Sequence, residues 1–244
     1  MHAWALSGAV PALLAMWYVD RLDAKRPEPR WTLRKVSIAG ALSVIPVIII
    51  ELMLLALAPP EGTYANAIWQ GVLVAAAVEE MAKVLCVYWL VWHTPEFDER
   101  LDGIVYAARA GLGFALVENV LYLAQASSSN EFIRIYILRA VLAVPGHAIW
   151  AGVMGYWGAR KRFDNAGPGL PGGYLAAVAM HGMYDLAIFL GPPLRADGYS
   201  GLAGALLILP LASVGVGALL LRGMARRALH ADDAAEAAAI GLQH

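Results

Sequence analysis

The sequence predicts an all-α protein, a polytopic transmembrane helix bundle of about seven spans. The 244 residues are 60% hydrophobic and only 15% charged, with a mean hydropathy of +0.59, whereas soluble domains are roughly half apolar and a quarter charged. The apolar residues also gather in runs close to the roughly 20 residues that a helix needs to cross a bilayer. Lipid is therefore the expected solvent for most of the surface.

Seven apolar runs are expected to form the spans, namely residues 3–19, 36–58, 66–92, 104–126, 132–159, 174–190 and 202–221. The run at 132–159 contains Pro145-Gly146 and is expected to kink or divide there, and its division would make eight spans. Residues 165–173 form a Gly- and Pro-rich connector, and 231–244 form a short Ala-rich end. We expect residues 1–244 to be a single integral membrane domain with a site-bearing core at about 66–190.

The distribution of basic residues predicts the orientation in the membrane. Cytoplasmic loops carry an excess of Lys and Arg. One set of alternate loops holds Arg21, Lys25, Arg26, Arg30, Arg34, Lys35, Arg100, Arg160, Lys161, Arg162, Arg222, Arg226 and Arg227, and the other set holds only Arg134 and Arg195. With seven spans, the N-terminus is expected outside and the C-terminus in the cytoplasm.

The remaining composition excludes several classes of protein. The net charge is −1, and no basic patch with interleaved aromatic residues predicts nucleic-acid binding. The single cysteine, Cys86, cannot form an internal disulfide framework, and its apolar neighbours favour a packing role over a nucleophilic one. Met1-His2-Ala3 has no basic segment of the kind that opens a cleavable signal peptide.

Ionisable side chains inside four of the apolar runs are the main functional signal. Such groups are costly in a bilayer and usually mark a function. They are Glu79, Glu80 and Lys83 in the third run, Glu118 with Asn119 in the fourth, His147 in the fifth, and His181 with Asp185 in the sixth. At 1.5 Å per residue, Glu79, Glu118 and His147 each lie roughly 20 Å from the cytoplasmic end of their run, with His181 and Asp185 about 10 and 17 Å into theirs. These groups are therefore expected to meet in one layer and form one site.

Spacing within each helix supports a shared site. Lys83 lies three and four residues after Glu80 and Glu79, so its amine can reach either carboxylate. Asp185 lies four residues after His181, an arrangement in which a carboxylate orients an imidazole. Gly111 and Gly113 precede Glu118 and allow a close approach between helices.

These groups, in this order, resemble the PrsW family of intramembrane proteases. The family patterns Glu-Glu-x-x-Lys, Phe-x-x-x-Glu-Asn and His-x-x-x-Asp are met by Glu79 to Lys83, Phe114 to Asn119, and His181 to Asp185. The resemblance covers roughly residues 69–189. The scheme is also similar to the CAAX prenyl protease superfamily, but Glu118 stands where those proteins carry His, which favours PrsW.

The resemblance implies an intramembrane protease of the cytoplasmic membrane of a prokaryote. Its substrate would be a membrane-anchored protein such as an anti-sigma factor, cut at the first of successive cleavages. We expect Glu79, Glu80, Glu118 and His181 to be catalytic, with Glu79 activating water. Supporting roles are expected for Lys83, Asn119, Arg139, His147 and Asp185, and Asn119 could serve as an oxyanion donor or join two helices by a hydrogen bond.

Two mechanisms remain open at this stage. A Glu/His pair could activate water without a metal, or a divalent metal such as zinc could bind the water. The expected ligand set is Glu79, Glu80, Glu118, His147 and His181, which is chemically suited to zinc, although the sequence lacks His-Glu-x-x-His. A structural role for His147 beside Pro145-Gly146 is the alternative for that residue.

A different class of function is also compatible with the same residues. Buried Glu, His, Asp and Lys side chains can form an ion or proton pathway, so a small ion- or proton-coupled transporter is the main alternative. Other polar residues in the runs are expected to be structural. Arg109 and Arg139 should form buried ion pairs or snorkel to the membrane interface. Glu51 should lie near the interface or pair with an Arg, and Asp102 should cap the fourth helix.

Overall fold

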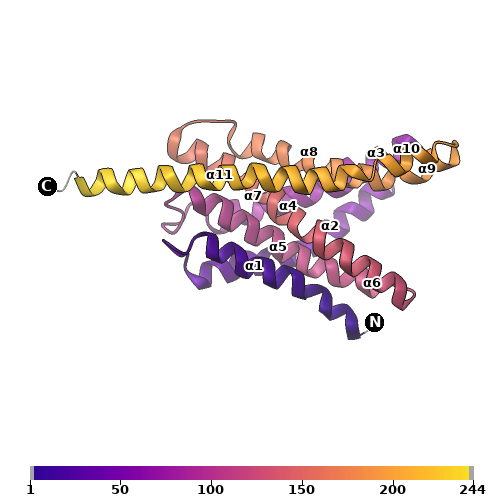
Figure 1. The fold of residues 1–244 in the computed structure, drawn as a ribbon, viewed down its shortest axis with the longest axis horizontal. Coiled ribbons are helices and arrows are strands. Elements are labelled where there is room, and N and C mark those ends of the chain that lie inside the picture. The colour runs from indigo at the N-terminus through magenta and orange to yellow at the C-terminus, as the bar shows by residue number, and fades with distance from the viewer. Residues whose placement is uncertain (1–2, 242–244) are drawn as a thin grey trace.

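The computed structural model describes residues 3–241, and within them the chain is helical without any strand. The helices lie side by side along one long axis, and the two termini lie at opposite ends (Figure 1). In chain order the helices are η1 (Ala3–Gly8), α1 (Ala9–Leu22), α2 (Arg30–Leu55), α3 (Tyr64–Ile68), η2 (Trp69–Ala77), α4 (Val78–Leu90), α5 (Arg100–Ala124), α6 (Ser129–Leu138), η3 (Arg139–Ala143), α7 (Val144–Asp164), α8 (Gly169–Phe189), α9 (Gly191–Ala196), α10 (Ser200–Ala205) and α11 (Ile208–Gly241).

The prediction of an all-α bundle with several apolar helices long enough to cross a membrane is confirmed. Five helical stretches of the described chain are long and apolar enough to cross a membrane, by length and composition: Arg30–Leu55, Arg100–Ala124, Ser129–Asp164, Gly169–Ala196 and Ser200–Ile240. The runs predicted at 3–19 and 66–92 are also helical, but they do not meet these criteria. The total of seven spans therefore stays a prediction.

The fifth run does not divide at Pro145, so the alternative of eight spans is wrong on that point. Ser129–Asp164 is one continuous helical stretch. Pro145 lacks an N–H donor and clashes with the preceding turn of a regular α-helix. Here the turns immediately before it, in η3, are π-helical, and this wider local geometry lets the helix continue past the proline.

Helix α5 occupies the centre of the bundle. Every residue from Leu101 to Ala115 is buried, whereas apolar side chains of α2 such as Ile45, Ile49 and Leu52 are more than half exposed. Exposed apolar side chains of this kind are expected where a helix contacts lipid. The centre of the bundle is thus protein-packed, and its outer surface is apolar.

Glycines on α5 set how closely its neighbours approach. A Cβ at Gly113 would overlap the carbonyl oxygen of Ser37 on α2, and one at Gly111 would overlap the carbonyl oxygen of His147 on α7. Only glycine leaves room for another backbone at these points. The predicted close approach is therefore present, and it places the Glu118 end of α5 beside His147.

The start of α5 differs in detail from the prediction that Asp102 is its N-cap. Glu99 occupies the N-cap position and Asp102 the third helical position, and the two side chains form a reciprocal capping box. Asp102 Oδ2 accepts hydrogen bonds from the backbone N–H groups of Asp98 and Glu99. Asp102 still satisfies free donors of the first turn, but from inside the helix.

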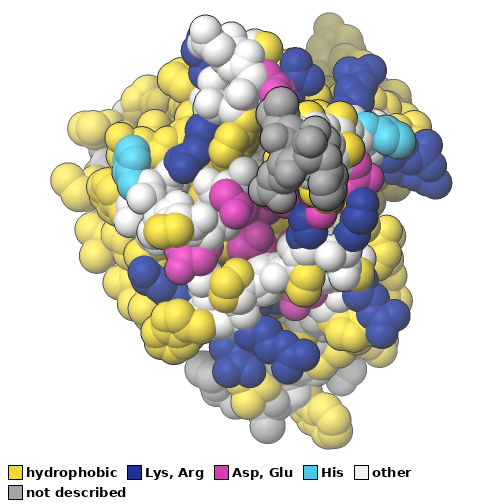
Figure 2. Space-filling view, turned by 90° about the vertical axis from the view of Figure 1, so that its left-hand side faces the viewer, with side chains coloured by type: hydrophobic (Ala, Val, Ile, Leu, Met, Phe, Trp, Pro, Cys, Tyr) yellow, Lys and Arg dark blue, Asp and Glu magenta, His cyan; other side chains and the backbone are white. Residues whose placement is uncertain are grey.

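The basic loops gather at the end of the bundle where α11 ends. Figure 2 shows this end, with Lys and Arg side chains lying around a group of acidic side chains. α11 extends to Gly241, well beyond the predicted end at 221, and ion pairs link residues in this extension to other segments. Asp232 contacts Arg100 at 2.9 Å, and Asp233 contacts Lys25 at 2.6 Å.

Candidate active site

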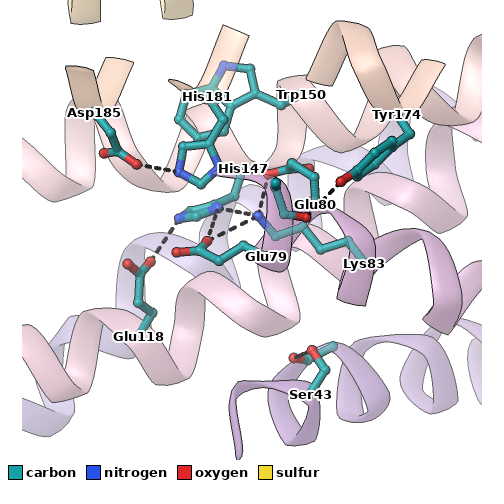
Figure 3. A network of polar contacts seen from close by, with 12 residues as sticks. Ser43, Glu79, Glu80, Lys83, Glu118, His147, Trp150, Tyr174, His181 and Asp185 are labelled. Atoms are coloured by element: carbon teal, nitrogen blue, oxygen red, sulfur yellow. Dashed lines mark hydrogen bonds and ion pairs between the residues drawn. The ribbon is translucent and has the colours of Figure 1, made fainter. Parts of the chain in front are cut away.

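The predicted carboxylate pair lies in the first turn of α4, directly after the π-helical segment η2 (Figure 3). Glu79 is 5% exposed, and Glu80 is fully buried. π-Helical turns change the direction of the side chains that follow them and are often found at functional sites. The backbone carbonyl of Ala77, at the end of η2, accepts a hydrogen bond from the Tyr174 hydroxyl of α8 at 3.0 Å.

Lys83 joins the two carboxylates to a histidine on another helix. Its Nζ lies 2.6 Å from Glu80 Oε1, 3.4 Å from Glu79 Oε2 and 2.8 Å from His147 Nδ1. The Lys83 side chain has no exposed surface, so these groups replace the water that an ammonium normally binds. An ammonium only donates hydrogen bonds, so His147 Nδ1 is the acceptor in this contact.

The other nitrogen of His147 contacts Glu118 on α5. The distance from Nε2 to Glu118 Oε2 is 2.8 Å. Because Nδ1 accepts from Lys83, Nε2 carries the hydrogen and donates it to the carboxylate. Glu118 therefore orients the imidazole, as carboxylates do in many metal and acid–base sites. A purely structural role beside Pro145 does not account for these contacts.

Arg139 and Asn119 complete the side of the network around Glu118. Arg139 Nη2 donates to Glu118 Oε2 at 2.6 Å, and its Nε donates to Asn119 Oδ1 at 2.6 Å. Asn119 Nδ2 in turn donates to the backbone carbonyl of Gly8 at 3.3 Å. The contacts of Asn119 are thus those of a residue that joins neighbouring segments, and the contact with Gly8 occupies one of the two N–H donors of its amide.

His181 lies between two carboxylates from different helices. Its Nδ1 is 2.9 Å from Glu80 Oε1, and its Nε2 is 3.1 Å from Asp185 Oδ2. The Trp150 ring stacks on the imidazole, with 4.3 Å between ring centroids and 17° between planes. The ring of His181 is thereby held in position and in orientation. Sequence reasoning did not single out Trp150, which is one of many aromatic residues in apolar runs.

All nine residues predicted for the site belong to one connected network. Hydrogen bonds and ion pairs link, in order, Asn119, Arg139, Glu118, His147, Lys83, Glu79 and Glu80, His181, and Asp185. The contributing helices are α4, α5, α7 and α8, together with the π-helical segment η3. The sequence predicted that these side chains lie at similar depths in the membrane, and in the structure they contact one another across the helices.

Three of the five predicted metal ligands form a compact donor group. Glu79, His147 and His181 each offer one ligand atom, and these atoms lie within 4.8 Å of one another in a buried position. Glu80 and Glu118 lie outside this group, because Glu80 contacts Lys83 and His181 and Glu118 contacts Arg139 and His147. The geometry therefore narrows the ligand set from five residues to three.

The chemistry of the donor group fits a divalent metal. Two imidazoles and a carboxylate are common zinc ligands. The network contains four carboxylates (Glu79, Glu80, Glu118 and Asp185) and only two permanent cations, Lys83 and Arg139. The buried Oε2 atom of Glu80 also has no hydrogen-bond partner within the described chain. A divalent cation there would lie among these carboxylates, but it would compete with Lys83 for His147 Nδ1 and with Glu80 for His181 Nδ1.

A cavity of about 300 Å³ adjoins the network between α2, η2, α4 and α5, and its lining includes Glu51, Glu79 and Glu118. Glu51 is therefore a wall residue of this cavity, and the expected pairing with an Arg is absent from the contacts of the described residues. The available signal was a carboxylate inside an apolar run, the same signal that identified Glu118. The spacing motifs did not include Glu51, because α2 has no second acidic residue or histidine that could form a motif with it.

Comparison with known proteins agrees with the resemblance seen in the sequence. A family model described as "PrsW family intramembrane metalloprotease" matches residues 28–214. The chain is 33% identical over 187 residues to "Protease PrsW" of Geobacillus kaustophilus, covering 76% of this chain and 79% of that protein. It is 28% identical over 191 residues to "Protease PrsW" of Bacillus subtilis, covering 77% of this chain and 84% of that protein.

No solved structure matches the chain. The bacterial relatives and the apolar helices fit a multi-pass membrane protein of a prokaryote. Because the relatives are proteases, the transporter alternative gains no support from them.

Proposed function

The chain belongs to the PrsW family of intramembrane metalloproteases, and from this premise we propose that it hydrolyses a peptide bond of a membrane-anchored protein at the Glu79 network. One observation carries the proposal. Carboxylate, imidazole and ammonium groups from four helices contact one another in the buried interior and adjoin a cavity lined by Glu79 and Glu118. An extended peptide segment entering that cavity would bring its carbonyl group next to ionisable side chains.

Glu79 is the best candidate for the residue that activates water. It lines the cavity, and its contacts to Lys83 and His147 are longer than those of Glu80, at 3.4 and 3.8 Å. Glu80 is held at 2.6 Å by Lys83 and at 2.9 Å by His181, which suits a residue that positions its neighbours. Glu79 can accept the proton of the attacking water and return it to the leaving amine.

His181 and His147 are oriented by carboxylates on the side away from Glu79 and Glu80. Asp185 holds His181, and Glu118 holds His147. An imidazole fixed in this way can keep a constant ring orientation during the reaction. Lys83 neutralises part of the negative charge that Glu79 and Glu80 carry together.

Glu79, His147 and His181 are the residues that would hold a divalent metal such as zinc. When bound, the metal would supply Lewis-acid activation of water and of the scissile carbonyl. Glu80 and Glu118 would then support the ligands through His181 and His147. The pure Glu/His mechanism uses the same residues without the metal.

The test is proteolysis of a candidate single-span protein co-expressed with the chain. We expect Glu79→Gln, Glu80→Gln and His181→Ala each to lower cleavage by at least about 10² to 10⁴-fold, the usual contribution of a positioned acid–base group. The matched control is Glu236→Gln, which makes the same chemical change at an exposed position on α11. Products are identified by mass. Full cleavage by the Glu79→Gln variant would show that the active site has been assigned to the wrong helix.

A chelator separates the two mechanisms. If a metal is required, stripping the purified protein of metal abolishes cleavage and zinc restores it. If the Glu/His pair acts alone, cleavage is unchanged by the chelator.

The proposed substrate is a membrane-anchored protein, and an anti-sigma factor is the candidate that the family resemblance suggests. The proposed location is the cytoplasmic membrane of a prokaryote, with the N-terminus outside and the basic end of the bundle in the cytoplasm. The proposed seven spans are an odd number, as this orientation requires.

A further inference from the structure

A second group of carboxylates lies at the basic end of the bundle, far from the Glu79 network. Asp23 and Glu28 belong to the loop between α1 and α2, and Asp102 lies in the first turn of α5. Each offers one oxygen, and the three oxygens lie within 4.8 Å of one another. Asp102 precedes Glu118 by 16 residues on the same helix, which is roughly 24 Å along its axis.

These three carboxylates lack the cationic partners that neighbouring acidic residues have. Asp164 and Asp232 pair with Arg100, Asp233 pairs with Lys25, and Glu99 pairs with Arg26. Within residues 3–241, no Lys or Arg forms an ion pair with Asp23, Glu28 or Asp102. Three close carboxylates without a counterion repel one another, and burial strengthens the repulsion.

Two oxygens of the group are buried and, within residues 3–241, accept no hydrogen bond from an N–H or hydroxyl group. They are Asp23 Oδ2 and Asp102 Oδ1, on residues that are 2% and 0% exposed. Asp102 Oδ2 is already held by the backbone N–H groups of Asp98 and Glu99, and Glu28 accepts a hydrogen bond from the Tyr106 hydroxyl. Buried carboxylate oxygens are normally satisfied. A proton shared between the Glu28 and Asp102 carboxyls would satisfy that pair. Asp23 Oδ2 has no partner of this kind among the described residues, and it is the atom that points to a ligand.

We propose that Asp23, Glu28 and Asp102 bind one hard divalent cation, Ca²⁺ or Mg²⁺, at the basic end of the bundle. Both ions prefer oxygen ligands, and opposite ligands lie about 4.6–5.2 Å apart around Ca²⁺ and about 4.0–4.2 Å apart around Mg²⁺. The three oxygens all lie within 4.8 Å of one another, which is close enough for them to share one ion of either kind. A cavity of about 410 Å³ adjoins the group, and its lining includes Asp23, Glu28 and four arginines, Arg21, Arg30, Arg34 and Arg109.

The cation would fasten the α1–α2 loop to the start of α5. Asp102 is rigid, because it is buried and takes part in the capping box. Asp23 and Glu28 come from a connecting loop, so the ion would order that loop by linking it to the central helix. Its effect is expected on the stability of the bundle and not on the bond-breaking step, since the distance to Glu118 is long.

The experiment is a calorimetric titration of the purified full-length chain in detergent, stripped of metal and then titrated with Ca²⁺ or Mg²⁺. Thermal unfolding is followed in parallel. We expect saturable binding of one ion per chain and a higher unfolding temperature in its presence. Asp23→Asn should weaken binding by at least about tenfold, and Glu28→Gln is the second variant in case Asp23→Asn does not fold.

Two controls locate the ion. Asp233→Asn makes the same chemical change on an exposed residue at the same end of the bundle, and it should bind the ion like the unaltered chain. Glu79→Gln should also bind like the unaltered chain, because that residue belongs to the other site. The proposal is overturned if neither ion binds saturably at millimolar concentration, if binding survives in both Asp23→Asn and Glu28→Gln, or if Glu79→Gln abolishes it.

Discussion

At the scale of single residues, Lys83 is the side chain on which the site depends most directly. It is fully buried and contacts Glu79, Glu80 and His147. The Glu79 and Glu80 carboxylates compensate the positive charge of Lys83, and Lys83 compensates part of their negative charge in return. Removing one member of such a buried group leaves an uncompensated charge, which costs more than the ion pair contributes.

We therefore predict that Lys83→Met destabilises the protein by about 3–5 kcal/mol. The measurement is thermal unfolding in detergent, with Lys161→Met as the control, because Lys161 is exposed at the end of α7. Adding Glu80→Gln to the Lys83→Met variant should recover part of the loss, since it removes one of the charges left unpaired. Equal unfolding temperatures for Lys83→Met and the unaltered chain would contradict this account.

At the scale of elements, the site depends on how closely α5 and α7 approach each other. α5 meets α7 at Gly103 and Gly155, where a Cβ on Gly155 would overlap the carbonyl oxygen of Gly103 and lie 2.7 Å from the Ala107 Cβ. Backbone atoms cannot move aside as a flexible side chain can. The same contact between α5 and α7 continues towards Gly111 and His147, so a shift of either helix would alter the pairing of His147 with Glu118.

The corresponding prediction is that Gly155→Ala destabilises the bundle by about 1–3 kcal/mol, the usual effect of overpacking, and also lowers cleavage. Gly223→Ala on α11 is the matched control, because a Cβ there meets no atom within 4 Å. Alanine is the better helix former, so the control should be neutral or stabilised by up to about 1 kcal/mol. Thermal unfolding and the cleavage assay are compared for both variants. Equal behaviour of the two would mean that the α5–α7 contact is more compliant than its geometry implies.

At the scale of the whole molecule, the opposite ends of the bundle differ in charge. The loops rich in Lys and Arg meet at the end where α11 finishes, and ion pairs link α11 to the α1–α2 loop and to α5 (Figure 2). Basic loops are retained in the cytoplasm. The described termini lie at opposite ends, as an odd number of spans requires (Figure 1).

We predict that a reporter fused after His244 is active in the cytoplasm and inactive outside. A reporter placed in the 165–173 loop should behave in the same way, because that loop lies at the same end of the bundle. A reporter placed in the connection at residues 197–199, between α9 and α10, should be active only outside. Activity of the C-terminal fusion outside the cell would reverse the orientation and with it the side assigned to the divalent-cation group.

The sequence by itself determined the class of fold and the members of the candidate site. Run length and apolar composition are enough to predict the all-α fold class. A bilayer offers no water to unpaired backbone N–H and C=O groups, so an apolar run of this length has to form a helix. Ionisable residues are so costly in the same runs that Glu79, Glu80, Lys83, Glu118 and His181 stood out without any structure. Their depths followed from the rise of a helix alone.

Only the tertiary structure decided which of these groups touch and what else lies beside them. The pairing of His147 with Glu118 and Lys83 depends on helix rotation, which the π-helical turns of η2 and η3 alter and which run length does not report. Glu51 lines the cavity because of how α2 is rotated in the bundle, which run length does not report either. Asp23 and Glu28 approach Asp102 across more than 70 residues of chain. Contacts of that kind arise from packing between helices, where glycines set the spacing, and no local pattern in the sequence encodes them.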